Sequence, residues 1–304
     1  MNRKTRRIVA TVVAVLLLAE GSSIAVSAAG TQSAPSYEIY SYQEHKGLSS
    51  VKNKTLSSYT RPSITLQGKS VAVRGVVIDG TYYIPFRAAA NALGASYSYV
   101  SATKTATMKL GNLTLISSDG CYTSYANDRA LFSIMPTVIM SDGRMYIPID
   151  IFLKATGLSA TSDRSSVAIT GRFSPLAHAS SFYRSDEVLW LARIIHAEAQ
   201  GEPLLGQIAV GNVVLNRVKS SAFPNTIYGV IFDRKYGVQF SPILNGTIYN
   251  TPSYNATLAA KICLDGFDIS DGAIYFLQPK LSTSSWIPKN RPYAFTIGNH
   301  DFYR

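Results

Sequence analysis

Residues 191–218 read LARIIHAEAQGEPLLGQIAVGNVVLNRV, with apolar residues at helical spacing on both sides of a Gly-Glu-Pro break. Glycine commonly ends a helix, and proline fits the first turn of one. The pattern therefore predicts a helix that Ser185 caps and that ends by Gln200, followed by a second helix that begins at Pro203. Glu198 would then lie in the last turn of a buried helix, at a helix–helix junction.

A carboxylate at this position is expected to hold its proton strongly. The C-terminal end of a helix carries partial negative charge and apolar packing disfavours an ion, so both raise the pKa of Glu198. A carboxylic acid that stays protonated near pH ~6–7 can protonate a glycosidic oxygen. Glu202 is four residues further on, but Gly201 and Pro203 break the helix between the two acids. We interpret Glu202 as structural, a capping carboxylate of the second helix.

An internal repeat with an offset of 63 residues precedes this region. Residues 78–110 and 141–171 share Asp-Gly, Tyr-Ile-Pro and a later glycine. Asp-Gly favours a tight turn, Tyr-Ile-Pro a short strand before a helix, and the glycine a helix end. A final strand is expected at 105–110 in one copy and at 167–170 in the other. The repeat predicts two hairpin–helix–strand units in a β-rich domain over residues 63–171.

The N-terminus has the form of a secretory signal peptide. Four basic residues precede an apolar run of 12 residues from Ile8 to Ala19, and small residues follow. A membrane span needs about 20 apolar residues, so we expect cleavage of the signal, with an uncleaved anchor as the alternative. The predicted layout is a signal peptide at 1–28, a polar linker at 29–62, the β-rich domain at 63–171, a linker at 172–184 and a mainly helical domain at 185–304.

Charge and cysteine content narrow the class of protein. The 304 residues carry a formal net charge of +11 and two cysteines. Two cysteines supply neither a disulfide framework nor a structural zinc site, so we expect Cys121 and Cys263 to be free. Removal of the signal leaves a surplus of about +8. In an exported protein this charge favours an anionic wall polymer over nucleic acid as the partner.

Several ordered motifs in residues 185–304 resemble one family. Ala-Glu-Ala at 197–199 precedes Gly-Glu-Pro, and Gln-Phe-Ser-Pro, Gly-Ala-Ile-Tyr and Ile-Gly-Asn-His follow at 239–242, 272–275 and 297–300. This order resembles the SleB/CwlJ-type cell wall hydrolases, or spore cortex-lytic enzymes. Their fold is similar to that of lysozymes and lytic transglycosylases. Gln200 stands where arginine is common in that family.

The resemblance implies cleavage of the MurNAc–GlcNAc β-1,4 bond of peptidoglycan, with Glu198 as the catalytic acid. Hydrolysis normally needs two carboxylates, whereas a lytic transglycosylase needs one acid and leaves 1,6-anhydro-MurNAc ends. Some family members degrade the spore cortex at germination. We expect substrate contacts from Gln239, Phe240, Ser241, Tyr275 and Asn299. For Phe240 and Trp286, sugar stacking and core packing stay open as alternatives, and we interpret His300 as a buried structural residue.

The repeat at 63–171 resembles the copper amine oxidase N-terminal-like stalk domain of bacterial cell-surface proteins. The resemblance implies no copper chemistry, because this stretch contains no histidine and one cysteine. We interpret it as a structural spacer or a wall-binding module. The whole chain is then expected to be α+β: a β-rich N-terminal domain, then a mainly α-helical, lysozyme-like catalytic domain with a small β element.

Two other functions are weighed against the transglycosylase. A zinc-dependent N-acetylmuramoyl-L-alanine amidase needs about three metal ligands, but His45 and His178 fall in linkers and His196 and Glu198 point to different faces of a helix. A non-catalytic cell-wall-binding protein would leave Glu198 unexplained. We therefore expect no metal and no cofactor.

The expected partner is the glycan strand of peptidoglycan, without nucleic acid and without a stable membrane span after signal cleavage. We expect a secreted protein at the cell wall or spore cortex of a Gram-positive-type bacterium. The oligomeric state stays open.

Overall fold

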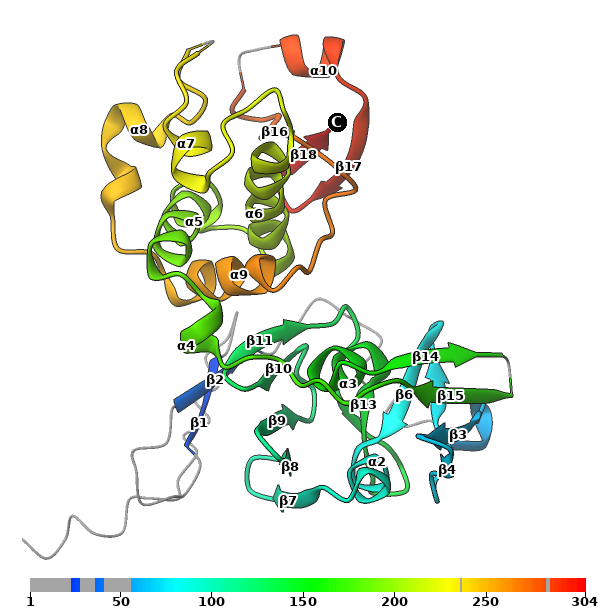
Figure 1. Ribbon diagram of the computed structural model, residues 1–304. Coiled ribbons are helices and arrows are strands. Elements are labelled where there is room, and N and C mark those ends of the chain that lie inside the picture. Colours follow the sequence, from blue (N-terminus) through cyan, green and yellow to red (C-terminus); the bar gives the residue numbers. More distant parts are fainter. Residues whose placement is uncertain (1–22, 28–35, 41–55, 164, 236, 283–284) are drawn as a thin grey trace, which may run out of the picture. The chain divides into compact units, whose positions relative to one another are not determined.

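The computed structural model describes residues 23–27, 36–40 and 56–304, except 164, 236 and 283–284. The chain divides into two compact units between His178 and Ala179 (Figure 1). This boundary lies inside the linker predicted at 172–184. Most of the predicted signal peptide and polar linker lies outside the described residues. The described parts of that region are the antiparallel pair β1 (Ser23–Ser27) and β2 (Ser36–Tyr40) and the short 3-10 helix η1 (Leu56–Ser58).

Among the described residues after η1, the N-terminal unit is built from three sheets and two short helices. Their strand orders are β11-β10-β9-β8-β7, β12-β13-β6-β5 and β14-β15-β3-β4. The elements are β3 (Ser63–Leu66), β4 (Lys69–Ser70), β5 (Val76–Ile78), β6 (Thr81–Pro85), α2 (Phe86–Leu93), β7 (Ser96–Val100), β8 (Thr105–Leu110), β9 (Leu113–Ser118), β10 (Thr123–Ala126), β11 (Arg129–Phe132), β12 (Val138–Ile139), β13 (Met145–Pro148), α3 (Ile149–Thr156), β14 (Ser159–Ser162) and β15 (Ser166–Thr170).

The two copies of the repeat meet at the centre of one sheet. Copy one runs β5-β6-α2-β7-β8 and copy two runs β12-β13-α3-β14-β15. Strands β6 and β13 are antiparallel, and Ile84 pairs with Ile147, its equivalent in the other copy. Tyr83 pairs with Pro148 as Tyr146 pairs with Pro85. Equivalent residues therefore exchange places about a local two-fold axis.

The ends of α2 and α3 confirm the expected turn chemistry. Pro85 and Pro148 directly precede the two helices. Gly94 and Gly157 follow them in the left-handed region, with φ of 75° and 71°. The final strands predicted at 105–110 and 167–170 are present as β8 and β15. Both copies also contain a strand that the prediction did not name, β7 and β14, and both strands are mainly exposed.

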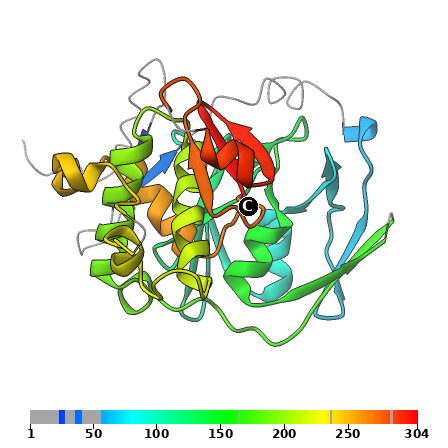
Figure 2. The ribbon, with the colours of Figure 1, turned by 90° about the horizontal axis from the view of Figure 1, so that it is seen from above.

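The C-terminal unit is mainly helical, with one three-stranded sheet in the order β16-β18-β17. The sheet lies beside α6, and α5 and α9 pack on the same helix (Figures 1 and 2). The elements are α4 (Ala179–Phe182), α5 (Ser185–Ala199), α6 (Leu204–Lys219), α7 (Ile227–Ile231), α8 (Pro242–Asn245), the 3-10 helix η2 (Thr247–Tyr249), α9 (Tyr254–Leu264), β16 (Tyr275–Leu277), α10 (Trp286–Asn290), β17 (Tyr293–Ile297) and β18 (His300–Tyr303).

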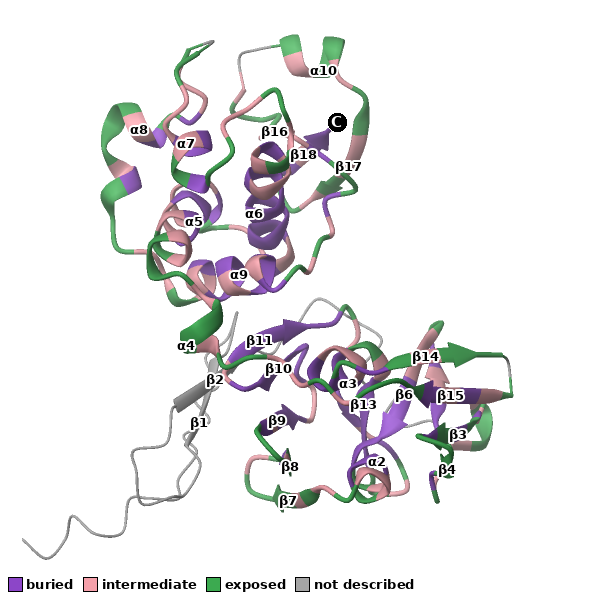
Figure 3. Cartoon of the chain, in the orientation of Figure 1, coloured by how far each residue is buried: buried purple, intermediate pink, exposed green. Residues whose placement is uncertain are grey.

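Helix α6 forms the centre of the C-terminal unit and is buried around most of its circumference (Figure 3). Gly211 allows the closest approach to its neighbours. A Cβ atom on this glycine would lie 2.8 Å from both Cys263 Sγ and Ile195 Cδ1. Cys263 and Cys121 are both buried and lie outside any disulfide, which confirms the prediction that neither forms one. The α+β class, with a β-rich N-terminal part and a helical C-terminal part, is likewise confirmed.

A helix that crosses a bilayer must be both long and apolar. No helix in the described part of the chain meets both conditions.

Candidate active site

Glu198 lies in the last turn of α5, close to the break that leads into α6. Its carboxyl is half-buried, and burial raises its pKa from 4.5 to about 7. The positive charge of Arg217 acts in the opposite direction and lowers the pKa of Glu198. Glu198 is therefore an acid that still carries its proton close to neutral pH.

Arg217 lies on α6 and is 5% exposed. Its Nε donates a hydrogen bond of 2.8 Å to the carbonyl of Ile274. The guanidinium lies 5.1 Å from the ring centres of Phe223 and Phe240 and 5.6 Å from that of Tyr275. Burial lowers the pKa of Arg217 to about 10 but leaves it a cation at neutral pH. Its Nη1 is buried without a hydrogen-bond partner among the described residues.

A second arginine, Arg291, packs on aromatic rings next to this group. Arg291 lies 4.7 Å above the ring of Tyr275 and 5.2 Å above that of Trp286. The rings of Tyr275 and Trp286 meet edge to face at 6.3 Å. Trp286 is 52% exposed, whereas Phe240 is 2% exposed. Of the two residues left open between sugar stacking and core packing, Phe240 is buried beneath Arg217 and Trp286 faces solvent.

The structure brings together part of the predicted substrate set. Phe240 and Tyr275 both pack on Arg217, whose charge acts on Glu198. Gln239 uses its amide to donate to the carbonyl of Gly237 at 3.2 Å, and Ser241 is exposed at the start of α8. The role of these residues in substrate binding stays a prediction.

Asn299 is engaged by a carboxylate. Glu202 Oε2 accepts a hydrogen bond of 2.9 Å from the Asn299 backbone N–H, and Oε1 accepts one of 3.0 Å from its side-chain amide. His300 is 4% exposed, its Nδ1 lies 3.7 Å from Glu202 Oε1, and burial lowers its pKa. His300 is therefore a buried structural residue, as predicted. The Glu202 carboxylate fixes the turn between β17 and β18.

Two local predictions about caps are wrong. Glu202 is structural, but no side chain caps the start of α6, where Pro203 is the N-cap residue. The N-cap residue of α5 is Arg184, and Ser185 is already the first helical residue, without a side-chain cap. The reason in the first case is that Asn299 occupies both oxygens of Glu202. In the second, Arg184 is the last extended residue, so Ser185 already has helical backbone angles.

Sequence reasoning missed Arg217 and Arg291. Arg217 belongs to the Asn-Arg-Val stretch at 216–218, and a second cation, Lys219, lies in the same helical turn, so the sequence does not single it out. Arg291 has no local signal, because its contacts with Tyr275 and Trp286 arise only when the sheet and α10 come together.

Histidines and acids in the described part of the chain form no group of three or more that could hold a metal ion. His196 accepts a long hydrogen bond of 3.4 Å at Nδ1 from the backbone of Ser253. The candidate site is the group formed by Glu198, Arg217 and the aromatic rings that pack on Arg217.

Comparison with known families agrees with this division of the chain. Residues 65–170 match the Copper amine oxidase N-terminal domain family, and residues 201–303 match the Cell Wall Hydrolase family. The chain carries a cell wall hydrolase domain. Glu198 lies just before the segment that matches this family model, so its candidacy depends on its geometry and on its own motif.

Curated spore cortex-lytic enzymes are similar in sequence to part of this chain. A spore cortex-lytic enzyme of Bacillus cereus is 40% identical over 120 residues, which cover 40% of this chain and 45% of the relative. The spore cortex-lytic enzyme of Bacillus subtilis is 38% identical over 120 residues, with 40% and 38% of the two chains covered. This chain thus spans less than half the length of either relative.

A solved structure is similar in sequence to the same region. The catalytic domain of the germination-specific lytic transglycosylase SleB from Bacillus anthracis is 39% identical. The match covers 40% of this chain and 97% of that one, with a TM-score of 0.37.

Proposed function

We propose that the protein is an exported peptidoglycan-cleaving enzyme that breaks the MurNAc–GlcNAc β-1,4 bond as a lytic transglycosylase. It would act in remodelling of the cell wall or spore cortex. The observation that carries the proposal is the half-buried Glu198, whose pKa is raised to about 7. An acid with this pKa is suited to protonate a leaving oxygen at neutral pH.

A single acid is enough for this reaction. Glu198 first gives its proton to the glycosidic oxygen, and the C1–O bond of MurNAc breaks as the GlcNAc hydroxyl leaves. The resulting carboxylate then removes the proton from the C6 hydroxyl of the same MurNAc, and O6 bonds to C1. The product is a 1,6-anhydro sugar, and Glu198 regains its proton. Holding the C6 hydroxyl near C1 supplies a high effective molarity in place of an activated water.

The surroundings of Glu198 support a single-acid mechanism. Burial and the Arg217 cation account for its altered pKa, and among the described residues no neighbouring carboxylate contributes. Glu202 is the nearest acid in sequence, and both of its oxygens accept hydrogen bonds from Asn299. Arg217 would stabilise the Glu198 carboxylate between the two proton transfers without preventing reprotonation.

Sugar contacts would come from the surface next to this pair. Tyr275 and Trp286 offer aromatic edges and faces, and Gln239, Ser241 and Asn299 offer polar groups. The positive charge of the mature chain suits retention on an anionic wall, which should weaken as salt increases.

The test is digestion of purified peptidoglycan by the full chain, with product analysis by mass spectrometry. Anhydro-muropeptides are expected from the wild type and from Glu187→Gln, a matched control in the exposed first turn of α5. Glu198→Gln should release none while keeping its fold. Hydrated reducing ends would mean a hydrolase, free stem peptides an amidase, and no release by the wild type a binding protein. Each of these three results would overturn the proposal.

A further inference from the structure

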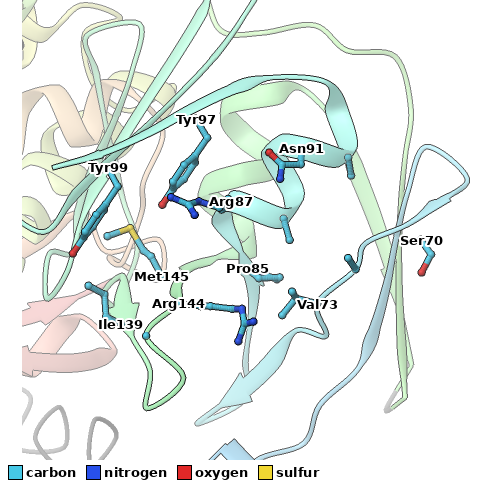
Figure 4. A pocket seen from close by; sticks show the side chains of 14 residues that line it. Ser70, Val73, Pro85, Arg87, Asn91, Tyr97, Tyr99, Ile139, Arg144 and Met145 are labelled. Carbon is cyan, nitrogen blue, oxygen red and sulfur yellow. The ribbon is translucent and has the colours of Figure 1, made fainter. Parts of the chain in front are cut away.

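A cavity of about 530 Å³ lies within the N-terminal unit, between elements of both copies of the repeat and the segment from β4 to β5 that precedes them (Figure 4). Its volume is in the range of sites that bind small ligands. Helix α2 supplies one wall, strand β7 a second, and the turn between β12 and β13 a third. Neither of the functions considered for the C-terminal unit uses it.

Two guanidinium groups face this cavity. Arg87 is exposed and lies 4.9 Å above the ring of Tyr97, and no carboxylate pairs with it among the described residues. Arg144 is paired with Asp142 at 3.0 Å through Nη1 alone. Because a guanidinium has five N–H donors, both side chains keep donors in the planar arrangement that binds a carboxylate.

The floor of the cavity is apolar. Val73, Pro85, Ile139 and Met145 line it, and Tyr99, which is 39% exposed, stands at its edge. The combination suits a ligand with small aliphatic groups and a carboxylate. A polymer of phosphates and hydroxyls would gain little from such a floor.

The second copy of the repeat lacks the equivalents of Arg87 and of the two tyrosines. At the 63-residue offset, Arg87, Tyr97 and Tyr99 correspond to Asp150, Ala160 and Ser162. The residues that build the fold agree between the copies, including Tyr83 with Tyr146 and Gly94 with Gly157. The repeat therefore folds without an arginine and two tyrosines at these three positions. Copy one has them where they line the cavity, and copy two has other residues at the equivalent positions.

We propose that this cavity binds the peptide stem of peptidoglycan. Arg87 and Arg144 would donate hydrogen bonds to a carboxylate of the stem, and the apolar floor would contact its alanine methyl groups. This inference rests on the proposed function for the identity of the polymer, but it concerns a site separate from Glu198. The N-terminal unit would then hold the enzyme on stem-bearing strands.

The test is calorimetric titration of the full-length Glu198→Gln protein with a synthetic stem peptide, Ala-γ-Glu-diaminopimelate-Ala. A matched probe carries the same peptide with its carboxylates amidated. We expect binding of the free acid, with at least a tenfold weaker Kd for the amidated peptide and for Arg87→Gln. Lys109→Gln, which removes an exposed cation of the same unit outside the cavity, should change the Kd less than twofold.

Three results would overturn the inference: no binding of the free acid, equal binding of the amidated peptide, or Arg87-dependent binding of poly(glycerol phosphate) in place of the peptide. The cleavage assay is independent of this titration. Peptide binding without anhydro products would disprove the proposed function and support the peptide-binding site. Anhydro products without peptide binding would disprove the peptide-binding site and support the proposed function.

Discussion

Glu202 holds Asn299, a residue 97 positions further along the chain, through two hydrogen bonds of 2.9 and 3.0 Å. The contact ties the α5–α6 break to the turn between β17 and β18. A Cβ atom on Gly298 would collide with the Glu202 carboxylate, so a glycine with φ of 59° is required beside it. The two acids that flank the break thus have separate tasks: Glu202 joins two parts of the fold, and Glu198 is available for chemistry.

The first prediction concerns Glu202→Ala. We expect it to lower the free energy of unfolding by about 2–3 kcal/mol, because the two donors of Asn299 lose their acceptor and the buried His300 ring loses the carboxylate beside it. Urea denaturation monitored by circular dichroism measures the change. Activity per folded molecule should fall far less than in Glu198→Gln. A loss of activity as complete as that of Glu198→Gln, in a fully folded Glu202→Ala protein, would contradict the division of tasks.

The second prediction is that Glu198→Gln stabilises the protein above neutral pH. The folded pKa of about 7 exceeds the ordinary glutamate value of 4.5, so the folded protein keeps a proton that the unfolded chain has lost between these two pH values. Stability therefore falls as pH rises from about 4.5 to 7, and the glutamine removes this penalty. At pH 8 we expect a gain on the order of 2–3 kcal/mol, and near pH 4 almost none.

Thermal unfolding at the two pH values, with Glu187→Gln as the control on the same helix, measures the difference. Equal effects of Glu198→Gln at both pH values would show that its carboxyl has an ordinary pKa.

The third prediction concerns the pH profile of cleavage. The rate should fall as pH rises through about 7, because the protonated acid is lost there. Arg217 lowers the pKa of Glu198, so Arg217→Gln should move this descending limb to higher pH, whereas Arg217→Lys should keep it nearer the wild-type position. Muropeptide release measured from pH 5 to about 9 gives the limb for each protein. A limb at the same pH in Arg217→Gln and wild type would exclude the proposed coupling.

The fourth prediction tests the packing of α6. Gly211→Ala should destabilise the C-terminal unit by about 1–3 kcal/mol, because its Cβ would press on Cys263 Sγ and Ile195 Cδ1 at 2.8 Å. The gain in helix propensity, about 1 kcal/mol, opposes this only in part. Adding Cys263→Ala should recover part of the loss in a double-mutant cycle read by chemical denaturation. Additive effects of the two substitutions would mean that the Cβ at position 211 does not press on Cys263 Sγ.

Local chemistry made much of the fold predictable. The Gly-Glu-Pro break separates α5 from α6 as expected, and Gly94 and Gly157 end their helices because a left-handed residue is needed there. The catalytic candidate was also accessible to sequence reasoning, since its pKa depends on burial within a helix whose apolar pattern is visible.

Long-range contacts were not predictable in this way. The partner of Glu202 comes from the far end of the unit, so local capping rules pointed to α6 instead. Arg217 appears in sequence as one of two cations in the same helical turn, and only the approach of Phe223, Phe240 and Tyr275 from separate elements shows that it is buried. The cavity beside Arg87 likewise forms only when turns from both copies come together.

The pairing of Ile84 with Ile147 gives the N-terminal unit the geometry of a symmetric dimer interface enclosed in one polypeptide. Each half presents the same strand to the other, so neither half can complete its sheet alone. A fragment cut between the copies would expose the edge of β6 and is expected to pair with a second fragment or aggregate. Engineering of this unit must therefore treat the two copies as one folding element, and both of them contribute residues to the cavity.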